Sequence, residues 1–260
     1  METTSASTTY AAYWLFKLDH AFARLNETER SQAKAEFLAA LEGRDAAISL
    51  RGVYSLVGLR EDADLMLWVH GTDLDAIQRL AVALRHSGLG SYLETRQTYI
   101  GVVASARYDP GHLPSFMLGA TPRKFISVYP FVKTTEWYLL PYERRRELMA
   151  EHGLIGRRYA VPREQLVPDA VPQPSAGKGG TALAQAPTVV AEGGGVLANT
   201  VDAFGLGDYE FILANESDDP SELCRMMESL RATEVRRYTQ QDVPIFLGRR
   251  REPAEALEDL

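Results

Sequence analysis

Apolar and polar residues along the first part of the chain follow two different periods. Four short apolar segments bounded by polar turns are typical of β-strands: 10–18, 48–59, 63–71 and 92–104. Two segments in which apolar residues recur every three or four positions predict helices: 25–43 and 73–90. Asn26 and Asp73 stand where these helices begin, and both residue types cap helix N-termini. The predicted order of elements is β-α-β-β-α-β.

The rest of the chain repeats this order. The predicted strands are 124–140, 198–206, 209–217 and 235–248, and the predicted helices are 141–153 and 219–233. Single residues repeat as well, because Val57-Gly58-Leu59 before one apolar strand is echoed by Phe204-Gly205-Leu206 before another. Such a duplication predicts an α+β fold made of two ferredoxin-like units whose sheets join.

The same pattern suggests the boundaries of the two units. We expect an N-terminal unit at 9–106 and a C-terminal unit at 124–250. The segment 107–123 between them is long and marked by Pro and Gly, which favours a loop that forms part of a site. Within the C-terminal unit, 161–195 is rich in Pro, Gly and Ala without a sustained period and predicts a flexible insertion. The last residues, 251–260, are predicted to be a solvated tail.

Composition and charge exclude several classes of function. The 260 residues are 45% hydrophobic, enough for a packed core, and a formal net charge of -7 disfavours a nucleic-acid partner. A single cysteine, Cys224, excludes an intramolecular disulfide and fits a reducing compartment. The N-terminal residues lack the features of a signal peptide, and no apolar run is long enough to span a bilayer. We therefore expect a cytoplasmic protein that binds neither nucleic acid nor membrane.

The strand that begins near residue 124 has two different faces, because side chains alternate along a strand. Its core face is purely apolar: Ile126, Val128 and Val132. Its other face combines aromatic, hydroxyl and ammonium groups: Phe125, Ser127, Tyr129, Phe131 and Lys133. The second face suits a flat apolar ring that carries acidic groups at its edge. A half-exposed sheet face without a ligand would explain the pattern equally well.

His152 is a second candidate. It shares a helix face with Leu148 and Met149, so its side chain is expected to face a core. A histidine in that position can bind iron. It can also be a hydrogen-bonded core histidine, or be favoured by the helix dipole, because Gly153 is predicted to end the helix directly after it.

Other candidates say less on their own. His112 lies in the loop 107–123, and the run Arg144-Arg145-Arg146 is predicted to be a solvated helix face. Three histidines near the ends of predicted elements are assigned structural or solvent roles: His20, His70 and His86. The sequence lacks a Gly-rich phosphate loop after a strand, a G-x-S-x-G motif and an H-E-x-x-H motif.

A series of motifs runs through the chain in order: Tyr129-Pro130-Phe131-Val132-Lys133, Glu136-Trp137-Tyr138-Leu139-Leu140-Pro141, Glu151-His152-Gly153, Ala198-Asn199-Thr200, Gly207-Asp208-Tyr209-Glu210 and Leu230-Arg231-Ala232-Thr233-Glu234. In combination they resemble the actinobacterial coproheme decarboxylases, the peroxide-dependent haem synthases of the chlorite dismutase superfamily. The resemblance extends over about Tyr10 to Arg250 and implies a dimeric α/β-barrel of the chlorite dismutase type.

The resemblance gives each matching residue a role. His152 stands where the family has the iron-binding histidine, Tyr129 where it has the radical-forming tyrosine, and His112-Leu113-Pro114 where it has a loop with a distal histidine. Lys133, where many relatives seem to have arginine, is expected to pair with a propionate. The remaining contacts to the porphyrin are expected from Phe131, Pro130, Val132 and Trp137.

The reaction implied by the resemblance is the oxidative removal of carboxyl groups from two propionates of coproheme by hydrogen peroxide. The product is haem b with two vinyl groups, so Fe-coproporphyrin III is both substrate and redox centre. His112 would serve as the base for peroxide, and the radical on Tyr129 would abstract hydrogen from the propionate. The resemblance also implies a homopentamer and a transient contact with the ferrochelatase that supplies coproheme.

The chain departs from the family pattern in the insertion 161–195 and in Arg236-Arg237-Tyr238-Thr239, where an Arg-Arg-His sequence is expected. Alternative functions therefore stay open. Chlorite dismutation requires a distal arginine, which the sequence does not locate. A paralogue in specialised metabolism, a haem carrier or sensor, and a purely structural member of the superfamily are the others.

Overall fold

The computed structural model describes residues 8–103, 113–162, 166 and 195–260. The N-terminal half contains β1 (Tyr10–Leu18), α1 (Glu27–Glu42), β2 (Ile48–Ser55), β3 (Leu65–Gly71), α2 (Leu74–His86) and β4 (Leu93–Val102). The C-terminal half contains β5 (Phe125–Lys133), α3 (Thr135–Leu139), α4 (Tyr142–Tyr159), β6 (Leu197–Asp202), β7 (Phe211–Ser217), α6 (Pro220–Arg231), β8 (Thr239–Gln241), β9 (Phe246–Arg251) and α7 (Pro253–Glu258). Short 3-10 helices lie at His20–Arg24, Leu89–Tyr92, Ser115–Leu118 and Glu234–Tyr238. The predicted α+β order therefore occurs in both halves.

Local sequence explains where the principal helices begin. Asn26 accepts a hydrogen bond from the backbone of Glu29, whose side chain accepts one from the backbone of Asn26, a reciprocal cap that fixes the start of α1. Asp73 caps α2 and Asp219 caps α6 through hydrogen bonds from backbone N–H groups. The predicted helix starts at Asn26 and Asp73 are confirmed.

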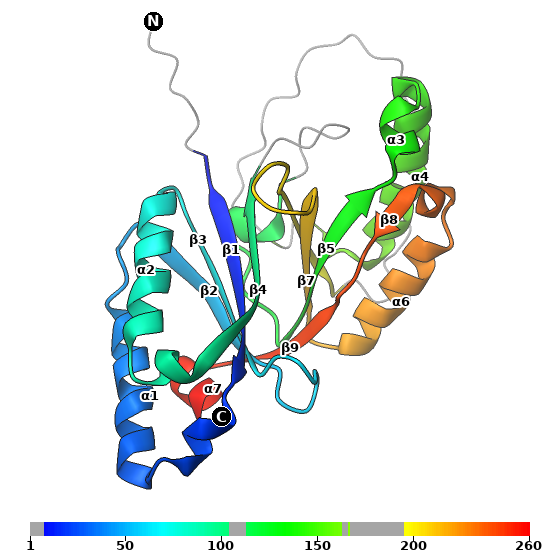
Figure 1. Ribbon diagram of the computed structural model, residues 1–260. Coiled ribbons are helices and arrows are strands. Elements are labelled where there is room, and N and C mark those ends of the chain that lie inside the picture. The colour runs from blue at the N-terminus through cyan, green and yellow to red at the C-terminus, as the bar shows by residue number, and fades with distance from the viewer. Residues whose placement is uncertain (1–7, 104–112, 163–165, 167–194) are drawn as a thin grey trace, which may run out of the picture.

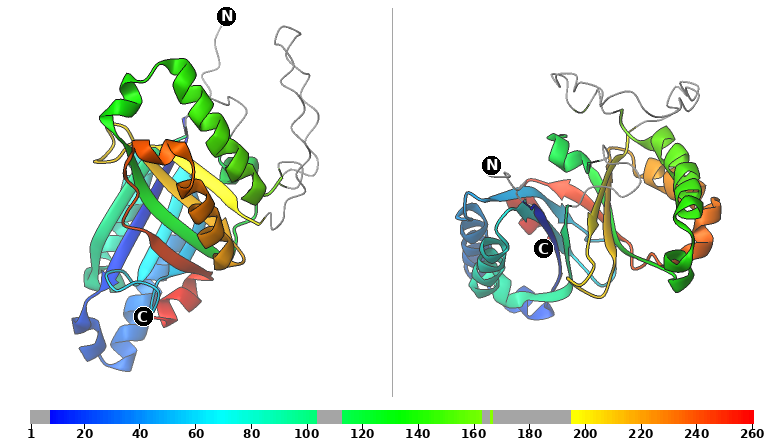
Figure 2. Two further views of the ribbon diagram at one scale, coloured as in Figure 1. Left: turned by 90° about the vertical axis from the view of Figure 1, so that its right-hand side faces the viewer. Right: turned by 90° about the horizontal axis from the view of Figure 1, so that it is seen from above.

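The strands form a closed antiparallel barrel. Their order is β7-β6-β4-β1-β3-β2-β9-β5-β8, and an additional pairing of β7 with β5 closes the sheet. The two halves meet at β2 with β9 and at β4 with β6, the latter through the single pair Val102 and Asp202. Figure 1 shows α1 and α2 on one side of the barrel and α4 and α6 on the other, and Figure 2 shows the same arrangement from above. The sheets of the two halves therefore join, as predicted.

Buried side chains divide into two large cores and several small ones. The barrel interior is filled from both halves by residues that include Tyr13, Tyr54, Trp68, Tyr99, Ile126, Val128, Ile212 and Phe246. A second core lies between the N-terminal strands and their helices, with Trp14, Phe37, Leu67, Ile77 and Leu80 among its members. On the outer side of the C-terminal strands the buried apolar clusters are much smaller: one holds Trp137, Leu148 and Val235, and another holds Val196, Leu223 and Met226. The duplicated halves are therefore filled unequally.

Three predicted boundaries are wrong. The strand from 124 ends at Lys133, because the following residues form the short helix α3 with main-chain hydrogen bonds such as Leu140 N–H to Glu136 O. The helix that contains His152 does not end at Gly153 but continues to Tyr159, because Gly153 is not in the left-handed conformation that ends a helix. The last predicted strand is divided into a 3-10 helix, β8 and β9.

The C-terminal residues are also different from the predicted solvated tail. They form α7, whose Ala256 and Leu257 are buried in the core that contains α1 and α2. Arg251 and Asp259 form an ion pair of 2.9 Å across this helix. The short apolar content of the tail is thus enough to dock it, because the N-terminal core offers an apolar surface.

Candidate active site

The outer face of β5 carries the polar residues that the alternation predicted. Ile126 and Val128 lie in the barrel interior, so Tyr129, Phe131 and Lys133 point outward, toward the side of the sheet where α4 and α6 lie. Tyr129 is only 3% exposed. The predicted division of this strand into an apolar inner face and a functional outer face is confirmed.

The Tyr129 hydroxyl is buried beside a single polar partner. Its oxygen accepts a hydrogen bond of 3.4 Å from Nδ2 of Asn215, a buried residue of β7. Burial raises the pKa of Tyr129 well above its ordinary value, the Asn215 hydrogen bond lowers it, the charge of Asp242 raises it and that of Arg231 lowers it. The phenol is therefore neutral at physiological pH and still carries its hydrogen.

Lys133 presents an ammonium group between two aromatic rings. Its Nζ lies 4.3 Å from the ring centroid of Trp137 and 5.0 Å from that of Phe131. Burial lowers the pKa of Lys133 to about 8, and the charge of Glu210 opposes that shift. Within the described ranges Lys133 forms no ion pair with a carboxylate. This cation can accept an anionic group from a ligand without displacing a protein partner.

His152 lies inside α4 rather than at its end, which removes the basis for a helix-dipole role. Its Nδ1 is buried and has no hydrogen-bond partner among the described residues. Burial, followed by the positive charge of Lys133, lowers the pKa of His152 to about 4. The imidazole is therefore neutral at physiological pH, and a neutral imidazole nitrogen is what iron binds. A satisfied core histidine would have had both nitrogens paired or hydrated.

Helix α4 is packed differently from its counterparts in the N-terminal half. Leu148 is the only buried residue among its 18 residues, whereas the 13 residues of α2 bury Ala76, Ile77, Leu80 and Leu84. Its main contacts are with α6 and with the 3-10 helix Glu234–Tyr238 rather than with the strands. Because an amphipathic helix is normally held by burial of its apolar face, α4 has unused capacity to pack against a ligand.

Aromatic rings on the outer face provide a suitable surface for such a ligand. Phe131 and Phe211 lie 6.4 Å apart between centroids, and Phe204 lies 5.1 Å from Phe211. Trp137 is buried against Leu148 and joins the end of β5 to α4. These rings, Lys133 and His152 come from three different elements and together offer aromatic contact, a cation and a neutral nitrogen.

Not every predicted contact lies on this outer face. Pro130 pairs across the sheet with Ile212, whose side chain fills the barrel interior, and Val132 alternates onto the same inner face as Pro130. These two residues therefore shape β5 from the side opposite Tyr129. His112 lies outside the described residues.

The other sequence candidates lie elsewhere. His20 and His86 are exposed, and His70 packs its ring 4.9 Å from Phe116 at the barrel interior. Arg144 pairs with Glu147 and Glu234, and Arg146 pairs with Glu143, so this run is the solvated, paired helix face that was predicted. No set of three or more His, Cys, Asp or Glu residues in the described part of the chain has the geometry to hold a metal ion.

Sequence reasoning missed several buried polar residues. Asn215 and Glu216 lie within the apolar strand β7, Asn199 lies in β6, and Arg51 lies in β2. Glu216 accepts a hydrogen bond from Arg51, and Asn199 donates to Glu216 and accepts from the backbone of Phe116. The available signal was a polar residue inside an otherwise apolar strand, since such residues must find partners when buried.

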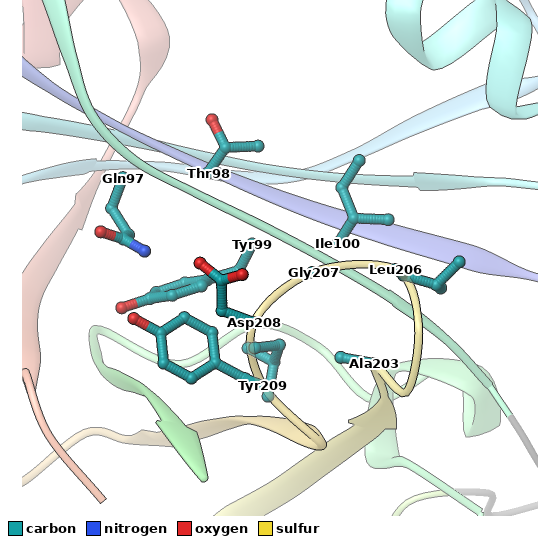
Figure 3. Close-up of a pocket in the computed structure, with 10 residues that line it drawn as sticks. Gln97, Thr98, Tyr99, Ile100, Ala203, Leu206, Gly207, Asp208 and Tyr209 are labelled. Carbon is teal, nitrogen blue, oxygen red and sulfur yellow. The ribbon is translucent and has the colours of Figure 1, made fainter. Parts of the chain in front are cut away.

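A well-formed pocket lies away from these residues. Figure 3 shows it between β4 and the segment 203–210, where the rings of Tyr99 and Tyr209 lie 5.6 Å apart. Its volume of about 150 Å³ is below the roughly 300–1,000 Å³ of pockets that enclose drug-sized ligands. A tetrapyrrole does not fit there, and no histidine lines the pocket.

Membrane insertion finds no support in the described helices, none of which combines the length and apolar character needed to cross a bilayer.

Comparison with known proteins adds an independent line of evidence. The chlorite dismutase family matches residues 30–168 and 188–251. The coproheme decarboxylase of Mycolicibacterium smegmatis is 35% identical over 207 residues, which cover 79% of this chain and 75% of that protein. A variant of the chlorite dismutase from Candidatus Nitrospira defluvii has the same fold, with a TM-score of 0.77 at 23% identity over 98% of this chain and 95% of that one. The same enzyme solved in complex with imidazole gives a TM-score of 0.75 at 24% identity, covering 96% and 94% of the two chains.

Proposed function

This chain belongs to the chlorite dismutase family, and we propose that it is a coproheme decarboxylase. It converts two propionates of coproheme III to vinyl groups and yields haem b. Each step consumes one propionate carboxylate, one hydrogen peroxide and one proton and releases a vinyl group, carbon dioxide and two water molecules. Peroxide takes the two electrons that the propionate side chain loses, so no further oxidant is needed.

The observation that carries this proposal is the buried, neutral imidazole of His152 with an unpartnered Nδ1. It stands on a helix that buries only Leu148, on the side of the sheet that carries Tyr129 and Lys133. A porphyrin between α4 and this face supplies the missing apolar contact, and its iron gives the imidazole a partner. The residues present therefore fit the substrate.

We assign the iron-binding role to His152 and the propionate-binding role to Lys133. When bound, coproheme supplies the iron at which hydrogen peroxide reacts. His152 holds the substrate by one ring nitrogen, and its lowered pKa keeps that nitrogen unprotonated. The Lys133 ammonium can pair with a carboxylate while its stem packs on Phe131 and Trp137.

Tyr129 performs the chemical step nearest the carboxylate. Its phenol loses one electron and one proton, and the resulting phenoxyl oxygen takes a hydrogen atom from the propionate chain, which restores the phenol. Loss of carbon dioxide and of a second electron from the substrate then gives the vinyl group. Burial supports this role, because a phenol that is 3% exposed is shielded from competing reactions with solvent.

The outer faces of β6 and β7 favour decarboxylation over chlorite dismutation. Chlorite dismutation is expected to need an arginine near the iron. The side chains that alternate with the barrel interior on these strands are Ala198, Thr200, Asp202, Phe211, Leu213, Asn215 and Ser217. Neither of these two described strands contributes an arginine.

Several further assignments complete the proposal. His112 is proposed as the distal base, and the units 9–106 and 124–250 as ferredoxin-like. We propose a cytoplasmic homo-oligomer, a pentamer by family resemblance, that receives coproheme by transient contact with a ferrochelatase. The single Cys224 is consistent with a reducing compartment.

The test is to mix the protein with coproheme and titrate hydrogen peroxide while following the porphyrin by mass spectrometry. We expect two successive losses of a carboxyl group with two hydrogens removed and haem b as the final product. A stable coproheme complex that peroxide only bleaches would support a carrier instead.

A further inference from the structure

Tyr129 and Asn215 face each other across two neighbouring strands. In the pairing of β5 with β7, Asn215 is opposite Ser127 and Leu213 is opposite Tyr129, so Asn215 is the diagonal neighbour of Tyr129 on the outer face. Both side chains are buried, with 3% of Tyr129 and 4% of Asn215 exposed. Neither can turn to solvent for another hydrogen bond.

The direction of the hydrogen bond constrains the phenol. Nδ2 of Asn215 is a donor, so the oxygen of Tyr129 is the acceptor, at 3.4 Å. The hydrogen of the phenol consequently points away from Asn215. The only hydrogen bond found for the Tyr129 hydroxyl among the described residues is this one, so its own hydrogen is left for an acceptor that the described protein does not provide.

Charges around the phenol do not supply that acceptor. Asp242 and Arg231 both influence Tyr129, but the Oδ2 atom of Asp242 accepts from Arg231 at 2.9 Å and from Arg236 at 2.7 Å. A carboxylate held by two guanidinium groups is a poor base toward a phenol. The hydrogen of Tyr129 is therefore reserved for a substrate carboxylate or a water molecule.

We propose that Asn215 is a positioning residue for Tyr129, one that holds the phenol with its hydrogen directed toward the substrate. This inference rests on the proposed function and extends it to a residue of β7. When Tyr129 is oxidised, its electron passes to the peroxide-driven reaction and its proton to the substrate carboxylate or water. A donor that stays on the phenol oxygen keeps that atom in place for the return of a hydrogen atom from the propionate.

The hydrogen bond can be measured without coproheme. In the full chain labelled with 3-fluorotyrosine, fluorine NMR follows the ionisation of each phenol, and the Tyr129→Phe variant identifies the Tyr129 signal among the 12 tyrosines. Asn215→Leu keeps the side-chain size but removes the donor. We expect it to raise the Tyr129 pKa by about 0.5–1 unit, the size of one ordinary hydrogen bond, while the other signals stay unchanged. Asn215→Asp should raise it further, because a carboxylate accepts the phenol hydrogen and repels the phenolate.

The second measurement is single-turnover decarboxylation at saturating coproheme. We expect Asn215→Leu to slow the reaction about tenfold with little change in coproheme affinity, and Asn215→Asp to slow it at least as much. In a Tyr129→Phe background, Asn215→Leu should have no further effect, because the two residues act through one group. A general folding defect would instead lower affinity and would add to the Tyr129 substitution.

Two results would overturn the inference. An unchanged Tyr129 titration in Asn215→Leu removes the hydrogen bond, whether or not the protein decarboxylates coproheme. A shifted titration with a wild-type rate of decarboxylation removes its importance for the reaction. Failure of the unsubstituted protein to convert coproheme would instead refute the proposed function, and is recognised because the titration does not depend on it.

Discussion

The guanidinium of Arg51 and the carboxylate of Glu216 lie 2.6 Å apart inside the barrel, where both side chains are buried. Arg51 belongs to β2 of the N-terminal half and Glu216 to β7 of the C-terminal half. Tyr54 donates a hydrogen bond to Glu216, and Arg51 also donates to the backbone oxygen of Ala120. The pair therefore links the two duplicated halves through their shared interior. Asn215, the proposed partner of Tyr129, is the residue directly before Glu216, on the opposite face of β7.

We expect Arg51→Met to destabilise the protein by about 3–5 kcal/mol, because it leaves the buried Glu216 carboxylate without its cation. Denaturant unfolding of the ligand-free protein measures this change. Arg79→Met is the matched control, since Arg79 forms only exposed ion pairs with Asp45 and Asp73 and should cost less than about 1 kcal/mol. Equal effects of the two substitutions would contradict a structural role for the buried pair.

His152→Ala should abolish the histidine-bound Soret spectrum of added coproheme and weaken its binding. The free energy of unfolding of the ligand-free protein should change little, because the substitution also removes a buried nitrogen that has no described partner. His86→Ala, at an exposed position at the end of α2, should leave both properties unchanged. An unaltered coproheme spectrum in His152→Ala would mean that another residue binds the iron.

Tyr129→Phe should bind coproheme as tightly as the unsubstituted protein but fail to convert it to haem b. The substitution preserves the aromatic contact and removes the hydroxyl hydrogen on which the proposed reaction depends. Stopped-flow absorbance and product analysis by mass spectrometry measure the two properties separately. Conversion at a rate near that of the unsubstituted protein would rule out the role proposed for this phenol.

Lys133→Met should weaken coproheme binding by about tenfold or more, the cost expected for losing a charge-assisted hydrogen bond. Methionine can still pack on Phe131 and Trp137, so the effect isolates the charge. Lys133→Arg keeps the charge and should retain most of the affinity. Fluorescence quenching on titration with coproheme gives both constants, and equal binding by all three proteins would exclude Lys133 as a propionate partner.

Replacing residues 163–194 by a short Gly-Ser link should leave the melting temperature almost unchanged. The backbone N–H of Val161 donates to Val196 O, and that of Val196 donates to Tyr159 O, so the two ends of this segment already meet. Removing α7 by truncation after Glu252 is the contrasting variant, because it removes the buried Ala256 and Leu257 and should cost several kcal/mol. A large loss of stability or coproheme binding on removal of 163–194 would assign that segment a structural or substrate-binding role.

Local sequence determined those features whose causes lie within a few residues. The capping box of Asn26 and Glu29 and the caps at Asp73 and Asp219 depend on residues at most three positions apart. The two faces of β5 follow from alternation along a single strand, which is why Tyr129 and Lys133 could be assigned to one side from the sequence. The face shared by His152 and Leu148 follows in the same way from helical spacing.

Tertiary structure decided what local pattern could not. Gly153 is compatible with either the end or the interior of a helix, and the residues after it continue α4 to Tyr159. The polar-looking tail became α7 because a distant apolar core was available to Leu257. The contacts of Arg51 with Glu216 and of Asn215 with Tyr129 join positions 165 and 86 residues apart, so they exist only in the register in which β5 and β7 close the barrel. Residue periodicity fixes which way a side chain faces along its own element, whereas its partner depends on which elements are packed beside it.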